Sequence, residues 1–284
     1  MTLVQEWIQK RALAQAAIMA ALLVAAWQAT SYLVRLATGG GIASLFDARP
    51  ALGTVLGLAS LGLFVGAYRL GGHWAAPGRR PDLAWPQFVR LSLVGSGCGA
   101  AAMLAIYAAI AVTHGPLSVT AGTLAYLLPN LTVTYAAAAA EELIFRGLLY
   151  QYLRQWAGTG VALVASSALF CAAHVSNDGI SLLAMLVIFL GGIALAATTE
   201  LTRSLWPAIA AHFAWNFVLG PLFGASLSGH RIHSAVVVEF REAPGGAFGY
   251  ENSWHALVVI TLVAAAAVAA VYRRRRRPPA NAGE

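Results

Sequence analysis

The sequence predicts an all-α protein, a polytopic transmembrane helix bundle with about eight spans. Of its 284 residues, 59% are hydrophobic and only 10% are charged, whereas a soluble domain carries about 25% charged residues. The apolar residues also gather in runs long enough to cross a bilayer, which takes roughly 20 residues of α-helix. We therefore expect a single membrane-embedded domain over residues 1–284, with little room for a separate soluble domain.

The predicted spans follow one another at about 12–36, 51–70, 91–113, 131–153, 160–176, 180–199, 205–222 and 255–272. The first begins after Lys10 and Arg11, as the apolar part of a signal peptide would. It exceeds the roughly 7–15 apolar residues of such a peptide, so we expect it to be retained. Residues 117–130 are open to two interpretations, a short partial helix or the first part of the fourth span.

The formal net charge of +7 is concentrated at the C-terminus, where five consecutive arginines follow the last span. This run predicts a basic cytoplasmic tail over residues 273–284 that contacts an anionic membrane surface. No basic face or aromatic platform accompanies it, so we expect no nucleic-acid partner.

With eight spans, both termini lie on one side of the membrane. Of the 18 Lys and Arg residues, the ones on the opposite side are Arg35, Arg49, Arg231 and Arg241. This asymmetry favours cytoplasmic termini.

Two adjacent glutamates lie inside the fourth predicted span. Ionisable side chains at membrane depth usually face a protein interior or a wet cavity and carry function. Glu142 and Arg146 are four residues apart, so they share a helix face and can form an ion pair. Glu141 lies on a neighbouring face, and its free carboxylate is suited to act as a general base. Alternatively, both glutamates pair with cations and only hold helices together.

Two histidines follow in the fifth and seventh predicted spans. Phe170 shares a helix face with His174, and His212 shares one with Asn216. His212 and Asn216 can both donate hydrogen bonds, so together they can hold a developing oxyanion. A lone buried histidine is more often a core residue than a catalyst, but two of them beside buried glutamates favour chemistry.

The three clusters are expected to meet in one cavity. Antiparallel neighbours bring Glu141 and His174 to a similar depth, and His212 falls in the middle of its span. Under the topology above, this cavity lies in the half of the bundle nearer the outside. That position suits a secreted or surface-anchored substrate, unless a span is miscounted around residues 117–130.

These residues resemble the CAAX prenyl-protease and bacteriocin-processing (CPBP, or Abi) family of intramembrane proteases. The family pattern is Glu-Glu-x-x-x-Arg, then Phe-x-x-x-His, then His-x-x-x-Asn or Asp, on core helices. The chain has these motifs in the same order, at Glu141-Glu142…Arg146, Phe170…His174 and His212…Asn216. The resemblance covers about residues 131–220, the core motif-bearing helices.

The resemblance implies a glutamate-type endopeptidase. Glu141 and His174 would activate a water molecule, His212 and Asn216 would stabilise the tetrahedral oxyanion, and Arg146 would order the two glutamates. An older interpretation of the family is a zinc protease, with Glu141, His174 and His212 as metal ligands. The chain has no His-Glu-x-x-His motif, so we favour a mechanism without a cofactor and keep zinc as the alternative.

We therefore predict an intramembrane endopeptidase that cuts near the C-terminal region of a membrane-associated protein or peptide. Its partners would be that substrate and the lipid bilayer. The Ala- and Arg-rich, lysine-poor composition indicates a bacterial inner membrane, where prenylated CAAX proteins are not the expected substrate. Two alternatives belong to other classes. One is a non-proteolytic membrane scaffold or bacteriocin-immunity factor, and the other is a proton-relaying transporter. The transporter is disfavoured because the chain lacks two related halves.

Overall fold

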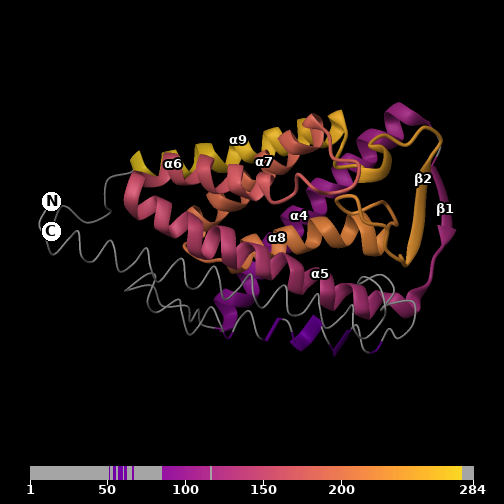
Figure 1. Cartoon of the computed structure of the whole chain (residues 1–284), viewed down its shortest axis with the longest axis horizontal. Helices are drawn as coiled ribbons and strands as arrows, with labels where there is room; N and C mark the ends of the chain where they lie inside the picture. Colours follow the sequence, from indigo (N-terminus) through magenta and orange to yellow (C-terminus); the bar gives the residue numbers. More distant parts are fainter. Residues whose placement is uncertain are drawn as a thin grey trace, which may run out of the picture.

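The computed structural model describes residues 85–115 and 117–276, together with single positions between 51 and 66. The described chain is an elongated helix bundle with a two-stranded sheet at one end (Figure 1). In chain order its elements are α4 (Trp85–His114), β1 (Leu117–Ala121), the 3-10 turn η1 (Leu124–Tyr126), α5 (Leu127–Glu142), the π-helical segment η2 (Leu143–Leu149), α6 (Tyr150–Ala172), α7 (Leu182–Thr202), α8 (Trp206–Phe217), the π-helical segment η3 (Val218–Leu222), β2 (Val236–Phe240), the 3-10 turn η4 (Gly246–Phe248) and α9 (Trp254–Arg276).

The described helices are long and apolar enough for a membrane protein. By length and composition, four helical stretches can cross a bilayer: Trp85–His114, Leu124–Ala172, Leu182–Thr202 and Trp254–Arg276. These stretches support the prediction of a helical integral membrane protein. The predicted span at 12–36 lies outside the described residues, and the one at 51–70 is described only at single positions. The total of about eight spans therefore stays a prediction.

One of these stretches contains two of the predicted spans, 131–153 and 160–176. Gly158 interrupts α6 with φ 82° and ψ 172°, a conformation that is open to glycine because it has no Cβ atom. Beyond Gly158 the chain returns along itself, since the ring of Phe170 packs on that of Phe145 with centroids 5.2 Å apart. The two spans are thus separate antiparallel passes, as the sequence predicts.

The all-α prediction missed a small antiparallel sheet. β1 pairs with β2 from Leu117 opposite Phe240 to Ala121 opposite Val236. Both strands are short and rich in β-branched residues, which favour a pleated sheet. Residues 117–126 therefore form a strand and a 3-10 turn, and α5 begins only at Leu127. No additional helix lies between α4 and η1 in the described chain, and the number of membrane passes stays a prediction.

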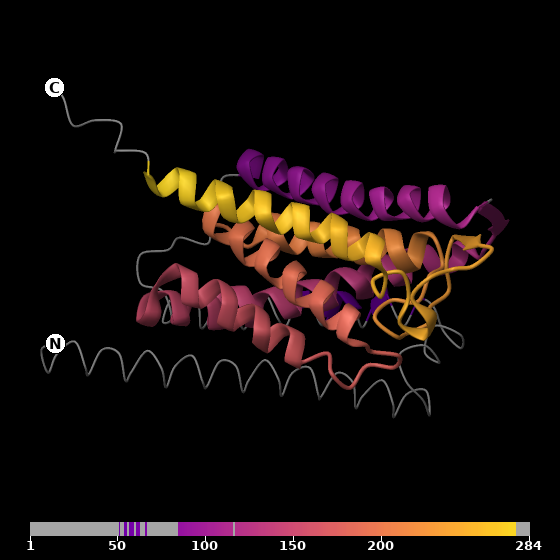
Figure 2. The ribbon, with the colours of Figure 1, turned by 90° about the horizontal axis from the view of Figure 1, so that it is seen from above.

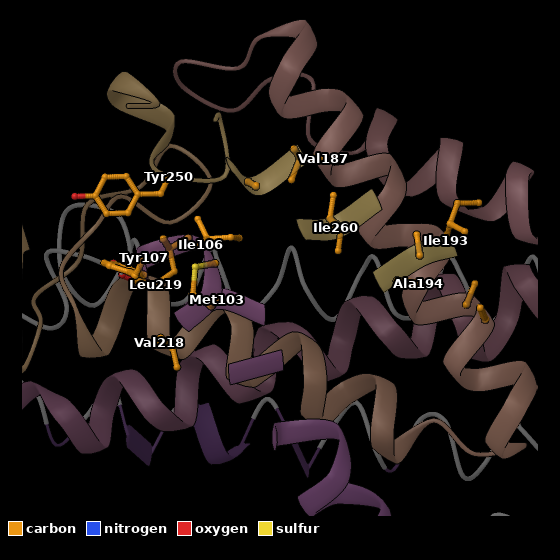
Figure 3. Packing of buried hydrophobic residues seen from close by; sticks show 14 of the residues in the cluster. Met103, Ile106, Tyr107, Val187, Ile193, Ala194, Val218, Leu219, Tyr250 and Ile260 are labelled. Carbon is orange, nitrogen blue, oxygen red and sulfur yellow. The ribbon is translucent and has the colours of Figure 1, made fainter. Parts of the chain in front are cut away.

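The stretch between the last two predicted spans, residues 223–254, is folded. We call residues 223–253 the cap. It contains β2 and η4, and it closes the end of the bundle that also carries β1 (Figure 1). Helix α9 starts beside the cap and runs to the opposite end (Figure 2). Beneath the cap, Met103, Ile106 and Tyr107 of α4 lie near Leu219 and Tyr250 (Figure 3), and the Tyr107 hydroxyl donates to the Leu219 carbonyl at 3.1 Å.

Helix α8 is held close to α4 by two glycines. A Cβ atom added at Gly95 would lie 2.3 Å from the carbonyl oxygen of Pro207, and one added at Gly99 would lie 2.1 Å from that of Ala211. Small residues at such positions let two helix backbones approach closely. Because Ala211 precedes His212, this contact helps to set the place of a predicted site residue.

Candidate active site

The Glu-Glu-x-x-x-Arg motif spans the end of α5 and the start of the π-helical segment η2. Glu141 and Glu142 are the last two residues of α5, and Arg146 lies in the π-helical segment η2 that follows. Single π-helical turns are frequent at functional sites. The predicted ion pair is present. Arg146 Nη1 lies 2.7 Å from Glu142 Oε1, and both side chains are 0% exposed. A charge buried so deeply needs such a partner.

Arg146 also ties three helical segments together. Its Nη2 donates to the carbonyl oxygen of Gly192 in α7 at 3.2 Å, and its guanidinium carbon lies 4.3 Å from the ring centroid of Phe170 in α6. A cation over an aromatic ring is worth most when it is desolvated, as here. Gly192 permits this packing, since an added Cβ atom would lie 2.8 Å from the Cβ of Ser167.

His212 joins the same carboxylate. Its Nδ1 lies 2.9 Å from Glu142 Oε1, the oxygen that already accepts from Arg146. A carboxylate accepts hydrogen bonds, so the Nδ1–H of His212 donates and its Nε2 is left to face Glu141. The sequence did not predict this contact. It joins motifs 70 residues apart, and helical spacing relates only residues within one helix.

His174 lies just past the end of its helix. The sequence predicts a span to residue 176, whereas α6 ends at Ala172 and His174 lies in the turn that follows. Its Nδ1 is 2.9 Å from the carbonyl oxygen of Phe170. Because a carbonyl only accepts, His174 also donates through Nδ1 and turns Nε2 toward Glu141. The last turn of α6 thus orients the ring of His174 through the carbonyl group of Phe170.

Glu141 is the point on which both histidines converge. Its Oε2 lies 3.8 Å from His212 Nε2 and 4.0 Å from His174 Nε2. These distances are too long for direct hydrogen bonds and short enough for a water molecule to bridge Glu141 to either histidine. Glu141 Oε2 has no hydrogen-bond partner among the described residues. Its side chain is 28% exposed, whereas that of Glu142 is 0% exposed, so Glu141 is the more accessible carboxylate.

Asn216 completes the set on α8, one turn after His212. It is partly buried, and within the described part of the chain no hydrogen bond engages its amide. Its donors are therefore available to a bound group. All six predicted residues lie on α5, η2, the turn after α6, and α8, and α5 packs along α8.

Two separations among the three acceptor atoms can be compared with the geometry of a zinc site. Tetrahedral zinc, with ligand bonds of roughly 2.0–2.2 Å, places its donor atoms about 3.4 Å apart. A carboxylate and two imidazoles are suitable zinc ligands, but the two separations found here are 3.8 and 4.0 Å. Among the residues that the structure describes, no group of three or more His, Cys, Asp or Glu side chains is placed to hold a metal ion.

The cap supplies residues that the sequence did not mark as part of the site. Buried Glu251 accepts from Trp215 Nε1 of α8 at 2.9 Å, and from the backbone and hydroxyl of Ser228 at 3.2 and 3.0 Å. A Cβ added at Gly229 would lie 2.4 Å from the carbonyl oxygen of Asp178, four residues after His174. The cap therefore braces both α8 and the turn that carries His174.

Phe248 of the cap is fully buried and packs with Phe170 and Cys171 at the end of α6. Glu251 and Phe248 belong to no periodic pattern in the sequence, which explains why sequence reasoning missed them. Their roles depend on tertiary contacts that only the folded chain shows.

Comparison with known protein families gives one match. Residues 123–218 match the model of the type II CAAX prenyl endopeptidase Rce1-like family. The matched region contains all six predicted site residues. The comparison with curated proteins gives no match. This family implies a membrane protease whose substrate is a membrane-associated protein. The match confirms the resemblance predicted from the motifs, and the matched residues form the helices around this site.

Proposed function

We propose that the chain is an intramembrane endopeptidase that hydrolyses a peptide bond near the C-terminal region of a membrane-associated protein or peptide. The observation that carries this proposal is the convergence of His174 Nε2 and His212 Nε2 on Glu141 Oε2, at 4.0 and 3.8 Å. A water molecule between these atoms would meet a base and two imidazoles. The family match supports the protease class.

The hydrogen bonds constrain where protons lie in this site. Both histidines donate through Nδ1, so each neutral ring presents an Nε2 lone pair. With the Glu141 carboxylate, a bound water would face three acceptors, yet a water molecule donates only two hydrogen bonds. For the water to bond to all three groups, one of them must donate a hydrogen bond to it, so the site needs one further proton. Placed on His212, it makes Nε2 a donor and leaves a cationic ring against the Glu142 carboxylate.

The proposed reaction follows from this placement. Glu141, assisted by His174, takes a proton from the water as its oxygen attacks the scissile carbonyl carbon. The carbonyl oxygen becomes an oxyanion that accepts hydrogen bonds from His212 Nε2–H and the Asn216 amide. The tetrahedral intermediate then breaks its C–N bond, and the proton held by Glu141 passes to the departing amine. Water is consumed, and a carboxylic acid and an amine are released.

Glu142 and Arg146 act on the reacting groups through His212. Glu142 Oε1 accepts from both Arg146 Nη1 and His212 Nδ1. This arrangement fixes the tautomer and ring orientation of His212, as a carboxylate does for the histidine of a serine protease. Arg146 holds the Glu142 carboxylate in place. We therefore propose Glu142 and Arg146 as positioning residues and Glu141 as the general base.

We propose that this chemistry needs no metal, because the acceptor atoms are spaced more widely than tetrahedral zinc requires. Purified protein should contain less than about 0.1 zinc ion per chain and keep its activity in a chelator. Stoichiometric zinc, together with activity that is lost on chelation and restored by zinc, would establish the metal-dependent alternative.

We propose an eight-span topology with both termini in the cytoplasm of a bacterial inner membrane, and a single membrane domain over residues 1–284 that ends in the basic tail at 273–284. In the described part of the chain, the arginines at the two ends of α9 support this proposal. Arg231 and Arg241 belong to the cap, whereas Arg273–Arg276 end α9 at the far end of the bundle. The turn carrying His174 packs against the cap, so this orientation favours a substrate reached from the outer side.

The test is a profile of protein termini in membranes from cells that make the wild-type chain or Glu141→Gln at matched levels. New C-termini, with their partner N-termini, should appear only with the wild type and should name the substrate. If the two profiles are identical and Glu141→Gln still protects or complements the cell, the chain acts as a scaffold or immunity factor instead.

A further inference from the structure

Another buried carboxylate lies outside the candidate active site, near the C-terminal end of α7. Glu200 is 3% exposed and accepts from the Tyr150 hydroxyl at 2.9 Å. Three arginines surround it. Arg154 Nε lies 2.8 Å from Oε2, whereas Arg203 Nη2 and Arg275 Nη2 lie 3.3 and 3.4 Å from Oε1. They come from α6, the residue that ends α7, and α9.

One carboxylate cannot neutralise three guanidinium groups. Arginine stays charged in proteins, so this cluster carries a net charge of about +2. Within the described residues no second carboxylate lies within ion-pair distance of the three arginines. Each uses one nitrogen for Glu200 and keeps further N–H donors. Arg203 and Arg275 are about half exposed, so these donors can reach a ligand.

Contacts to backbone and hydroxyl groups fix the positions of the arginines in this cluster. Arg203 has φ 57°, and its backbone N–H closes α7 on the carbonyl of Thr199. Arg275 also donates to the hydroxyl of Thr159, next to the break at Gly158, and the neighbouring Arg274 donates to the Leu201 carbonyl. Glu200 therefore gathers cationic groups from three elements that would otherwise repel one another.

Two features place this cluster at a membrane surface. Trp156 and Tyr272 are exposed on α6 and α9 near the same end of the bundle, and such aromatic residues collect at membrane–water interfaces. The cluster also lies at the ends of helices that can cross a bilayer. Arginine donors at that depth match the phosphate of a lipid headgroup in charge and hydrogen-bond geometry.

We propose that Arg154, Arg203 and Arg275, gathered by Glu200, form a binding site for the phosphate of an anionic phospholipid headgroup. The lipid anchors the ends of α6, α7 and α9 to one leaflet. The site is separate from the proposed protease chemistry, and its test needs no enzymatic activity.

The test uses the full chain in detergent, with bound lipids counted by native mass spectrometry during titration with phosphatidylglycerol or phosphatidylcholine. The wild type should bind one phosphatidylglycerol in preference to phosphatidylcholine. Arg203→Gln should weaken that binding about fivefold, which is the contribution of one arginine to binding at an anionic surface. Arg276→Gln is the matched control, because Arg276 is exposed at the same end and forms no hydrogen bond or ion pair with a described residue. It should change binding less than twofold, by about 0.4 kcal/mol or less.

Glu200→Gln distinguishes a binding site assembled by Glu200 from non-specific attraction of anionic lipid to the basic surface. It raises the positive charge by one, so a diffuse attraction would bind phosphatidylglycerol more tightly. A site that Glu200 assembles should instead bind it more weakly, because the arginines lose their common partner. Tighter binding, or equal effects of Arg203→Gln and Arg276→Gln, would overturn the proposal. The comparison of the two arginine variants remains decisive if Glu200→Gln does not fold. Inorganic phosphate that competes as well as the lipid would show a free-phosphate site and also overturn it.

Discussion

Replacing Glu142 by glutamine tests whether the buried ion pair is as isolated as the geometry indicates. The change keeps the size of the side chain and removes its charge. Arg146 would then be a guanidinium with 0% exposure and a neutral partner. Removing one partner of a buried pair costs about 3–5 kcal/mol, so we expect a loss of that size in the free energy of unfolding. His212 loses its charged acceptor at the same time, and cleavage should fall at least about tenfold.

The assay is equilibrium unfolding of the purified chain, followed by tryptophan fluorescence, beside cleavage of the substrate that terminus profiling identifies. Glu141→Gln is the matched control, because Glu141 is one residue away but forms no direct hydrogen bond through Oε2 in the described part of the chain. It should change the free energy of unfolding by less than about 1 kcal/mol. Its cleavage should fall about 100-fold to 10,000-fold, as for the loss of a general base.

A double variant tests whether the loss of stability comes from the unpaired charge of Arg146. Glu142→Gln with Arg146→Met removes both buried charges, and replacing a buried pair by uncharged groups is often neutral for stability. Most of the lost stability should return, while cleavage stays low because His212 still lacks its carboxylate. The reasoning would be refuted if Glu142→Gln unfolded like the wild type, or if the double variant were less stable than the single one.

Three further predictions concern other contacts. Gly99→Ala should lower cleavage at least about tenfold and destabilise by about 1–3 kcal/mol, since its Cβ would lie 2.1 Å from the Ala211 carbonyl oxygen; Gly97→Ala, whose Cβ would meet nothing within 4 Å, should be silent in both assays. Asn216→Ala should reduce kcat about 100-fold to 1,000-fold, as for the loss of one oxyanion donor, with an unchanged unfolding curve; a lower stability with full kcat would contradict its role. Glu251→Ala should destabilise by about 1–3 kcal/mol, because it leaves buried donors of the cap and α8 unpaired, and limited proteolysis should then cut the cap first; a cap as resistant as the wild type would argue against this bracing.

Helical spacing and hydropathy predicted a good part of the fold and the residues of the site. The four-residue separation of Glu142 and Arg146 gave their ion pair, and the gap between two apolar runs located the break at Gly158. The expected meeting of Glu141, His174 and His212 is also found. Each of these features follows from local periodicity or from the antiparallel packing of neighbouring spans.

The remaining features depend on contacts between distant segments. The hydrogen bond from His212 to Glu142 joins α8 to the end of α5, and the prediction left Glu142 with Arg146 alone. The sheet of β1 and β2 pairs residues about 120 positions apart, so the short runs that form it resembled loop or helix. The cap lies between two predicted spans, and its polar and glycine residues gave no sign that Phe248 and Glu251 are buried.

The central claim is that Glu141, His174 and His212 hold a water molecule for hydrolysis. An experimental structure at a resolution that shows ordered water tests it directly, with anomalous data recorded above the zinc edge. We predict a solvent peak within about 2.6–3.2 Å of Glu141 Oε2 and both Nε2 atoms, with no anomalous signal. A peak about 2.0–2.2 Å from all three atoms with a zinc signal, or a side chain that fills the space between them, would contradict the account.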